Sequence, residues 1–463
     1  FWAAALAYDG AIEAAVKHAR SLAMGGDDEA AKQAYLEALR LDPTCFDALN
    51  DLGALTYASG HRSAARTAYR QAVQRHPRNP IGRVNLANIP SEDGDHGAAQ
   101  AHYLAALEVD PDFPEAHQGL ARIFSDLGDE RAELHRQKGY IGHAIDHRRC
   151  RGIGPGVPIL LLATVRLGNM PTRQWIDERT FAVTVIYVEF WDATQPLPPH
   201  ALVVNVIGDA DLCGEALTRA EDLLAQTAAP VINPPARVRT TGRADNARRL
   251  AAIPGVVAPK IATLARAEIL AAGGFRFPLL LRAPGFHTGR HFLFVENREG
   301  LTSAVETLPG DPLMAIQYLD ARGPDGMARK YRVMCIDGKL FPLHLAISAD
   351  WMVHYFTAAM ATHAAYRAEE RRFLEDMPEA LGERTMAALE GLFSEIGLDY
   401  VGADFALAPD GSLLLFEANA TMVVIAPPPE PWDYRRAAAA DVLEAAKRMA
   451  SSRAGIGASD RHS

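Results

Sequence analysis

The fold of the C-terminal half is decided by the stretch Leu398-Asp-Tyr-Val-Gly-Ala-Asp-Phe-Ala-Leu-Ala-Pro-Asp-Gly-Ser-Leu-Leu-Leu-Phe-Glu-Ala-Asn-Ala-Thr421. Residues 401–408 and 412–416 within it are apolar runs of the kind that form strands. Asp410-Gly411 between them is among the strongest signals for a two-residue hairpin turn. The stretch is therefore predicted to form a β-hairpin.

The register of this hairpin brings two carboxylates together. With a two-residue turn Pro409 lies opposite Ser412, and counting outward places Asp404 opposite Glu417, with side chains roughly 5 Å apart. Asn419, two residues further on, points to the same face. Like charges on one rung are destabilising unless a cation or a protonated partner offsets them. Two carboxylates and an amide oxygen suit Mg²⁺, so the pattern favours a magnesium site, with solvated carboxylates on an edge hairpin as the alternative.

The composition is that of a soluble globular protein with roughly two to four domains. The chain has 463 residues, of which 49% are hydrophobic and 22% are charged. Its 47 basic and 57 acidic residues give a net charge of −10, which argues against general affinity for nucleic acid or anionic membranes. No apolar run reaches the length of a membrane span. The cysteines have no Cys-x-x-Cys spacing, so the sequence indicates neither a zinc site nor a disulfide framework. A cytoplasmic location is therefore expected.

The two ends of the sequence carry expectations of their own. The first residue is Phe1 and not methionine, so further residues are expected before it. The apolar opening 1–8 has no basic leader and is predicted to be the remainder of a helix, not a signal peptide. Residues 451–463 are polar and predicted to be a disordered tail.

A period of 34 residues runs through the N-terminal third. Each unit is expected to be a helical hairpin, in which glycine permits the turn, alanine lets the helices approach and proline ends the second helix. A fourth unit has Gln137 in the tyrosine series and no closing proline, so it is expected to be a capping pair. The series are Gly26, Gly60, Gly94 and Gly128; Ala30, Ala64, Ala98 and Ala132; Tyr35, Tyr69 and Tyr103; Leu52, Leu86 and Leu120; and Pro43, Pro77 and Pro111.

Over about residues 1 to 140 this pattern resembles the tetratricopeptide repeat. The resemblance implies a binding module for a peptide or protein segment. A rigid spacer or a dimerisation surface is the alternative.

A breaker-rich segment, 151–158, separates the array from short apolar runs that alternate with a helical segment. Residues 158–165, 182–188 and 201–207 are predicted strands, and 211–226 is a predicted helix. This alternation favours a small parallel sheet.

A loop with glycines and basic side chains follows the predicted strand 277–282. Glycine lets backbone N–H groups approach an anion, and the cations favour a polyphosphate, although such a loop is by itself also an ordinary turn. The residues concerned are Arg282, Gly285, His287, Gly289 and Arg290.

Asp337-Gly338 predicts a second hairpin. Its register places Arg332 opposite Leu343, with Lys330 on the face of Arg332 and His344 on the other face. Two cations on one face favour an anion, and a solvated face is the alternative. His344 is expected to be a core or supporting histidine and not a catalyst.

The order of these pieces resembles the ATP-grasp superfamily over about residues 155 to 450, and in particular carboxylate-amine ligases such as glutathione synthetase and the ribosomal-protein glutamate ligases. The shared pieces are the Phe-Pro-apolar-basic strand, the glycine loop, the strand end Gln317-Tyr-Leu-Asp, the hairpin Tyr-Arg-Val-x-x-Ile-Asp-Gly, Gly-x-Asp404 and Phe-Glu417-Ala-Asn419.

The resemblance implies ATP and Mg²⁺ as cofactors and a role for each matching residue. Arg332 would lie near the transferred phosphoryl group. Arg282 and Arg243 stand where the family usually has lysine, and arginine is a planar fork and not a point charge. The remaining implied residues are the metal ligands Asp404, Glu417 and Asn419, the adenine hinge Gln317, Tyr318 and Leu319, and the phosphate lid with Gly285, His287, Thr288, Gly289 and Arg290.

The predicted protein is an all-α tetratricopeptide repeat solenoid followed by an α/β and α+β ATP-grasp-like domain. The implied activity is an ATP-dependent ligase that activates a carboxylate as an acyl phosphate for attack by an amine, with Arg282, Arg290 and Arg332 as catalytic residues and the array recruiting a peptide or protein. A non-catalytic repeat scaffold with a degenerate or merely nucleotide-binding domain is the alternative. The expected bounds are 1–148 for the repeats, 149–157 for a linker, 158–250 for the first α/β domain, 251–450 for the ATP-grasp domain and 451–463 for the tail.

Overall fold

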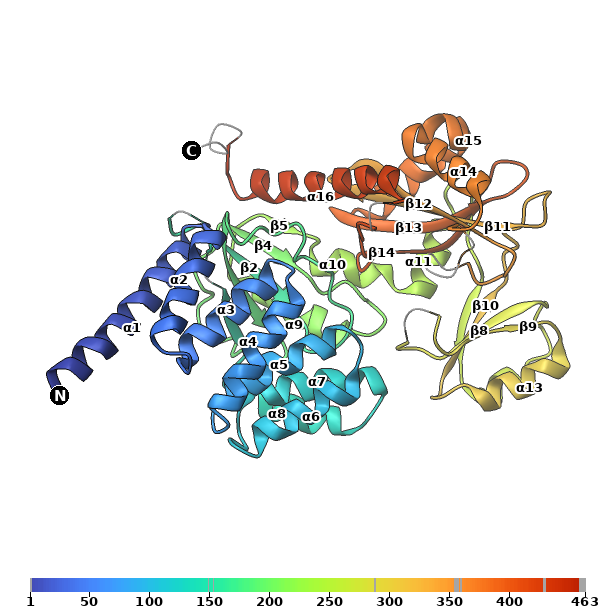
Figure 1. Ribbon diagram of the computed structural model, residues 1–463. Coiled ribbons are helices and arrows are strands. Elements are labelled where there is room, and N and C mark those ends of the chain that lie inside the picture. The colour runs from blue at the N-terminus through green and yellow to red at the C-terminus, as the bar shows by residue number, and fades with distance from the viewer. Residues whose placement is uncertain are drawn as a thin grey trace. The chain divides into compact units, whose positions relative to one another are not determined.

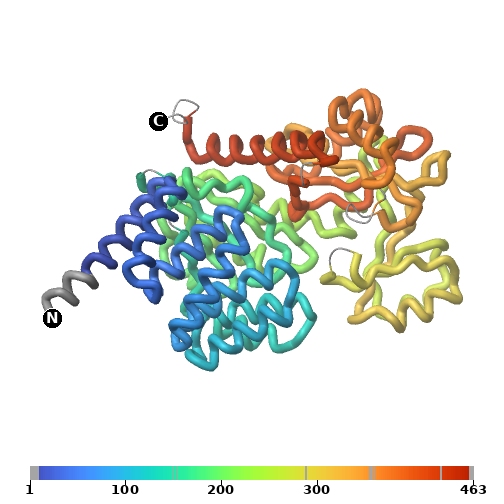
Figure 2. Tube along the Cα trace, viewed as in Figure 1, coloured from blue at the N-terminus to red at the C-terminus, as the bar shows by residue number. Residues whose placement is uncertain are grey.

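The computed structural model describes residues 2–148, 150–152, 154–286, 289–353, 358, 360–427 and 430–457. Two compact units make up the chain, which Figure 2 traces from end to end. Unit 1 is Phe1–Leu161, Val165–Leu167 and Asp177–His200, and unit 2 is Leu162–Thr164, Gly168–Ile176 and Ala201–Ser463. The domain bounds expected from the sequence remain a prediction.

Unit 1 begins with a helical repeat array of four helix pairs (Figure 1). The glycines of the period, Gly26, Gly60, Gly94 and Gly128, each lie between the two helices of a pair with φ between 70° and 82°, a backbone conformation that glycine adopts without strain. The tyrosines of the period are buried in the array. The helices are α1 (Trp2–Met24), α2 (Asp28–Leu41), α3 (Phe46–Ala58), α4 (Arg62–Arg75), α5 (Pro80–Glu92), α6 (His96–Leu107), α7 (Pro114–Leu127) and α8 (Arg131–Tyr140).

A mixed α/β region follows the array, so the predicted order of fold classes is confirmed. Its first sheet has the strand order β1-β3-β2-β4-β5. β4 and β5 are parallel, as expected, whereas β1, a strand that was not predicted, pairs antiparallel with β3, so the sheet is mixed and not wholly parallel. The sequence did not reveal β1 because an edge strand keeps polar residues, here Asp146 to Arg148. The strands are β1 (Ile145–Arg148), β2 (Val157–Ala163), β3 (Phe181–Tyr187), β4 (Leu202–Asn205) and β5 (Val231–Ile232).

Unit 2 contains a four-stranded antiparallel sheet of order β7-β10-β8-β9. The short helices α12 and α13 pack their apolar side chains against it and close one core. The elements before and within this part are α9 (Gly214–Leu224), α10 (Pro235–Val238), η1 (Arg239–Thr241), α11 (Arg243–Leu250), β7 (Ile261–Leu264), α12 (Arg266–Ala271), β8 (Leu279–Arg282), β9 (Phe292–Val295), α13 (Arg298–Thr307) and β10 (Leu313–Gln317).

A second sheet of unit 2 has the order β12-β11-β13-β14-β6. Helices α14 and α16 contact its strand β12. The elements are β6 (Val256–Val257), β11 (Ala328–Ile336), β12 (Lys339–Ser348), α14 (Ala364–Glu375), α15 (Met377–Ile396), β13 (Tyr400–Leu407), β14 (Leu413–Asn419) and α16 (Asp433–Arg453). Because α16 continues to Arg453, the first residues of the predicted disordered tail are helical, and residues 458–463 lie outside the described residues.

The turn of the β13–β14 hairpin differs from the prediction. The Ala408 N–H donates to the Ser412 carbonyl over 2.8 Å, so the loop has the three residues Pro409 to Gly411 and Pro409 does not lie opposite Ser412. Gly411 takes a φ of 78°, as three-residue hairpin loops require at their left-handed position. Pro409 has no N–H with which to form the ladder bond that a two-residue turn needs there.

A β-bulge then restores the predicted register. Phe405 pairs with Leu415 while Asp404 pairs with Glu417, so Phe416 is the extra residue on β14. The longer loop and the bulge cancel, and the predicted rung of Asp404 and Glu417 is confirmed.

The β11–β12 hairpin has a single bulge, and nothing cancels it. The ladder runs as predicted from the Asp337-Gly338 turn to Val333, but the register shifts between Val333 and Arg332. Arg332 therefore lies opposite His344 and not Leu343, and the prediction that His344 occupies the other face is wrong.

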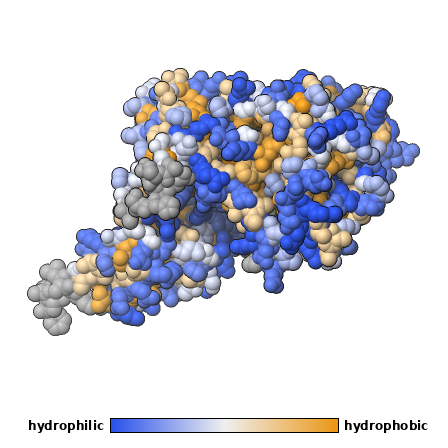
Figure 3. Space-filling model, turned by 90° about the horizontal axis from the view of Figure 1, so that it is seen from above, coloured by the Kyte–Doolittle hydropathy of each residue, from blue (hydrophilic) through white to orange (hydrophobic). Residues whose placement is uncertain are grey.

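Hydrophilic side chains cover most of the face seen in Figure 3, with smaller apolar areas between them. Within the described ranges, no helix is both long enough and apolar enough to cross a membrane.

Candidate functional site

Unit 2 encloses a cavity of about 540 Å³, a size typical of small-molecule sites. Its walls come from the ends of β8 and β10 in one sheet and from β11 to β14 in the other. One part of the wall is apolar and aromatic, and the other is dominated by charged side chains. Among the described residues the charged side chains are Asp209, Asp211, Arg243, Arg282, Lys330, Arg332, Asp404, Glu417 and Arg435.

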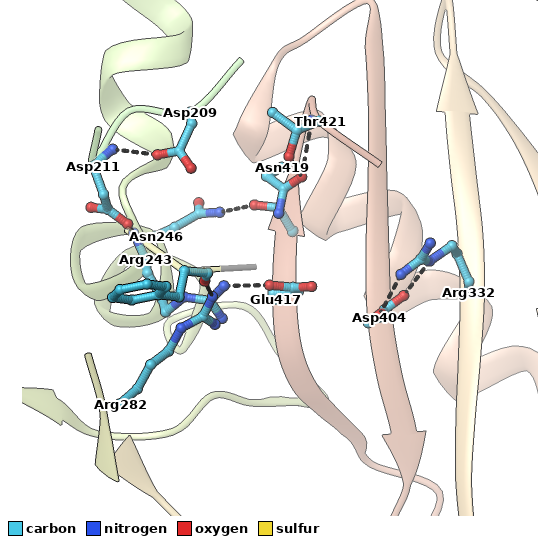
Figure 4. Close-up of polar contacts among 12 residues, drawn as sticks. Asp209, Asp211, Arg243, Asn246, Arg282, Arg332, Asp404, Glu417, Asn419 and Thr421 are labelled. Atoms are coloured by element: carbon cyan, nitrogen blue, oxygen red, sulfur yellow. Dashed lines mark hydrogen bonds and ion pairs between the residues drawn. The ribbon is translucent and has the colours of Figure 1, made fainter. Parts of the chain in front are cut away.

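Asp404 is held by two cations from the neighbouring strand β11. Its carboxylate accepts hydrogen bonds from Arg332 Nε (2.5 Å) and Nη2 (2.8 Å), as Figure 4 shows. Lys330 Nζ lies 3.1 Å from Oδ2. Burial raises the pKa of this carboxyl group, but Arg332 and Lys330 outweigh burial and hold its pKa well below the ordinary range. Asp404 is therefore ionised and fully engaged by protein donors.

Glu417, on β14, is directed toward a different cation. Its Oε2 accepts a hydrogen bond of 2.5 Å from Arg243 Nη2, at the start of α11 (Figure 4). Burial and the Asp404 charge raise the pKa of Glu417, but Arg243 together with Lys330 and Arg332 lowers it by more, so that the net shift is downward. The Arg243 backbone N–H donates to Asp211 Oδ2 over 2.9 Å, which fixes the helix start that carries this arginine.

Asn419 completes the predicted trio. Its Oδ1 accepts from the backbone N–H of Thr421 (3.0 Å) and from the Thr421 hydroxyl (2.9 Å), and the side chain lines the cavity. These two bonds fix the orientation of the amide, and Figure 4 shows the contact between Asn419 and Thr421.

The trio fits Mg²⁺ only in part. Glu417 uses only Oε2 in the contacts described and borders the cavity, so its other carboxylate oxygen is the one best placed for a metal. Asn419 also borders the cavity, but its Oδ1 already accepts both hydrogen bonds from Thr421. Asp404 has both oxygens occupied. In the part of the chain that the structure describes, no group of three or more His, Cys, Asp and Glu side chains is arranged to hold a metal ion.

The predicted phosphate lid begins beside the cavity. Arg282, at the end of β8, lines the cavity and donates from Nη2 to the Phe286 carbonyl. Gly285 and Gly289 have φ values of 85° and 75° and also line it. The guanidinium of Arg290 lies 5.7 Å from the centre of the Phe286 ring, and Arg290 is not among the described residues of the cavity wall. The predicted lid residues His287 and Thr288 lie outside the described residues.

Gln317, Tyr318 and Leu319 line the apolar part of the cavity at the end of β10. The Gln317 backbone N–H donates to the Lys260 carbonyl (2.8 Å), and its side-chain Oε1 accepts from the Lys260 N–H (3.1 Å), so this strand end is fixed. The Trp351 ring continues the wall, and Phe294 supports both rings by packing edge-on against Tyr318 and stacking on Trp351. This end suits a flat aromatic ligand such as adenine.

Three further features of the wall were not predicted as site residues. His344 lines the cavity because of the β12 bulge, and burial together with Arg332 lowers its pKa well below the ordinary value. Asp209 and Asp211 follow the carboxyl end of β4, a position at which ligands commonly bind and which the sequence could have signalled. Arg435, in the first turn of α16, had no signal of that kind.

Comparison with known proteins concerns the repeat array first. Residues 12–45 match the tetratricopeptide repeat family model. The repeat array is also similar to a solved structure of pilF of Pseudomonas aeruginosa, with 21% identity over 29% of this chain and 61% of that chain and a TM-score of 0.27. A crystal structure of MamA is similar with 20% identity over 28% of this chain and 75% of that chain and a TM-score of 0.26. This chain thus spans about three fifths of the pilF chain.

The mixed α/β region has a structural neighbour of its own. A crystal structure of a RimK domain protein ATP-grasp from Sphaerobacter thermophilus is similar with 18% identity over 65% of this chain and 99% of that chain and a TM-score of 0.41. None of the curated proteins matches the sequence.

Proposed function

We propose that unit 2 is an ATP-dependent ligase that converts a carboxylate into an acyl phosphate, which an amine then attacks to form an amide. The observation that carries the proposal is the cavity of unit 2, which joins an aromatic end at Tyr318 and Trp351 to a cationic end at Arg243, Arg282 and Arg332. That division matches the two halves of a nucleoside triphosphate, an aromatic base and a polyanion.

The cationic end supplies electrostatic stabilisation and needs no covalent nucleophile. Arg282 and Arg332 would contact the phosphates and the acyl phosphate, and Lys330 adds a third positive charge beside Arg332. Arg290 remains a proposed catalytic residue of the lid. Bound Mg²⁺ would neutralise charge on the phosphate oxygens, with Glu417 and Asn419 as the residues that hold it and Asp404 as the third ligand expected from the sequence.

The repeat array is proposed to recruit a peptide or protein. A tethered partner would be presented to the ligase at a raised effective concentration, so the acid or the amine is proposed to belong to that partner. The proposed location is the cytoplasm.

Nucleotide binding is the first test. Calorimetry of the full chain with ADP and MgCl₂ is expected to give a dissociation constant of about 1 µM to 1 mM, the usual range for enzyme substrates. Arg282→Met should weaken binding at least about tenfold, since a desolvated charge contact is lost. The matched control is Arg219→Met, an exposed arginine on α9 whose partner is Glu215. No binding by the folded wild type would contradict the proposal.

The second test addresses the reaction. Incubation with ATP, a pool of carboxylic acids and hydroxylamine should convert an acyl phosphate into a hydroxamate, with release of one ADP and one phosphate for each hydroxamate formed. Arg332→Met should abolish the product while ADP still binds.

A non-catalytic nucleotide-binding domain is the second candidate. It is favoured by the ion pairs that already engage Asp404 and Glu417. ADP binding without hydroxamate from any acid in the pool would support this candidate over the ligase.

A further inference from the structure

We propose that Asp404 is a positioning residue that holds Arg332 and Lys330 toward the phosphates, and that it is not a magnesium ligand. Of the three ligands expected from the sequence, Glu417 would then supply the carboxylate for the metal, and Asn419 could contribute only by sharing the oxygen that accepts from Thr421. The inference rests on the proposed function, because it concerns the same nucleotide site.

The first argument is the saturation of the carboxylate. Arg332 and Asp404 are direct partners on the neighbouring strands β11 and β13, so the guanidinium fork meets both carboxylate oxygens without bending either strand. Its two hydrogen bonds measure 2.5 and 2.8 Å, and Lys330 approaches Oδ2 as well. Bidentate pairs of this kind are among the strongest hydrogen bonds in proteins. A metal would have to displace this pair to reach Asp404.

The second argument is burial. The Asp404 side chain is 2% exposed, whereas the Glu417 side chain is 30% exposed. Mg²⁺ gives up water reluctantly and usually keeps several water ligands, which a carboxylate buried under two cations does not accommodate. Glu417 and Asn419 border the open part of the cavity instead.

The third argument is local charge. Lys330 and Arg332 contribute two positive charges and Asp404 one negative charge, so this cluster has a net charge of +1 and faces the cavity. Such a cluster repels Mg²⁺ and attracts a phosphate oxygen. Among the described residues Glu417 forms its ion pair with Arg243, and that pair is neutral.

The fourth argument comes from the backbone. The register shifts between Arg332 and Val333 on one side of β11, and between Asp404 and Phe405 on one side of β13. Both bulges therefore flank the rung of Arg332 and Asp404. Bulges re-aim side chains and are frequent beside active sites. Because of these bulges, His344 lies opposite Arg332 and Glu417 lies opposite Asp404. Arg332 and Asp404 pair with each other without a register shift.

The experiment uses Mn²⁺ as a paramagnetic substitute for Mg²⁺ with the full chain and saturating ADP, and measures bound metal by electron paramagnetic resonance. Glu417→Gln should weaken Mn²⁺ at least about tenfold. Asp404→Asn should leave the Mn²⁺ affinity within about twofold while hydroxamate formation falls at least about a hundredfold, since Arg332 loses its orientation. The matched control is Asp129→Asn, which removes another bidentate arginine pair, with Arg131 in unit 1.

The outcomes separate the two proposals. If the wild type binds neither ADP nor Mn²⁺, the proposed function fails and this inference fails with it. If the wild type binds both and Asp404→Asn weakens Mn²⁺ as much as Glu417→Gln does, only the inference is overturned. Should Asp404→Asn not fold, a crystal structure of the wild type with ADP and Mn²⁺ decides the question. An Asp404 oxygen about 2.1 Å from the anomalous peak overturns the inference, and an intact Arg332–Asp404 pair away from the peak supports it.

Discussion

Arg435 and Glu370 form an ion pair in the interior of unit 2, with Nη2 and Oε2 2.6 Å apart and side chains that are 5% and 0% exposed. Glu370 also accepts hydrogen bonds from the Tyr434 hydroxyl (2.6 Å) and from the Leu345 N–H (3.2 Å). The guanidinium lies 4.0 Å from the centre of the Trp432 ring. The Glu370 carboxylate on α14 thus fixes both the start of α16 and the strand β12. It holds β12 at Leu345, the neighbour of His344 in the sequence.

Glu370→Gln is expected to destabilise unit 2 by about 3–5 kcal/mol, because it leaves the buried Arg435 charge uncompensated. Urea unfolding followed by circular dichroism measures the change. The matched control is Glu215→Gln, which breaks an exposed pair with Arg219 on α9 and should cost about 0.5 kcal/mol or less. An unchanged urea midpoint for Glu370→Gln would show that the pair contributes nothing to stability.

Gly53→Ala is expected to destabilise the repeat array by about 1–3 kcal/mol. A Cβ atom at Gly53 would lie 2.5 Å from the ring of Tyr69, which is buried and has no room to move away. Gly10→Ala in α1 is the control, since its Cβ would meet nothing within 4 Å, and it should stabilise the helix by about 0.5–1 kcal/mol. Thermal unfolding of both variants gives the comparison, and equal shifts of both would contradict the packing argument.

The repeat array is expected to lose stability as the pH falls from about 6.5 toward 4. The first value is the ordinary pKa of a histidine, and the second is the pKa of His135 in the folded protein. Burial, with His117 at 2.7 Å, lowers the pKa of His135 to about 4. The unfolded chain therefore binds the proton at a higher pH than the folded chain does, which favours unfolding in that window. The loss between pH 7 and pH 5 should be on the order of 1 kcal/mol.

His135→Asn removes this proton uptake, so its stability should fall less than that of the wild type over the same pH range. The same substitution at the exposed His143 is the matched control. Urea midpoints at pH 5, 6 and 7 supply the measurement. Parallel pH profiles for the wild type and His135→Asn would refute the assignment.

Adenine nucleotides are expected to change the fluorescence of Trp351, which stacks on Phe294 at a centroid distance of 5.5 Å and lines the cavity. The expected result is quenching that saturates with ADP, and Trp351→Phe should remove most of the signal. Trp191→Phe, a substitution in unit 1, is the matched control and should retain it. A signal that survives Trp351→Phe unchanged would place the base elsewhere.

The sequence predicts those parts of the candidate site that depend on turn type and strand alternation, and it does not predict those that depend on β-bulges. The Asp-Gly turn and the alternation of the strands placed Asp404 opposite Glu417, and the ladder has that rung although the loop is one residue longer. The prediction survived because the Phe416 bulge compensates for the longer loop. The same count failed at Arg332, where the single bulge of β12 brought His344 to the cavity. Bulges have no reliable sequence signal, since the packing of both sheet faces selects them.

The sequence by itself determined the 34-residue helical period, the change from a helical array to a mixed α/β region, and the hairpin that carries Asp404 and Glu417, because each follows from the backbone preferences of residues close together in the chain. Only the tertiary structure decided which cation each carboxylate holds. Arg332 reaches Asp404 across 72 positions of the sequence and Arg243 reaches Glu417 across 174. Such pairs depend on which distant segments pack side by side and on how much water remains between them, and neither quantity is encoded in local periodicity.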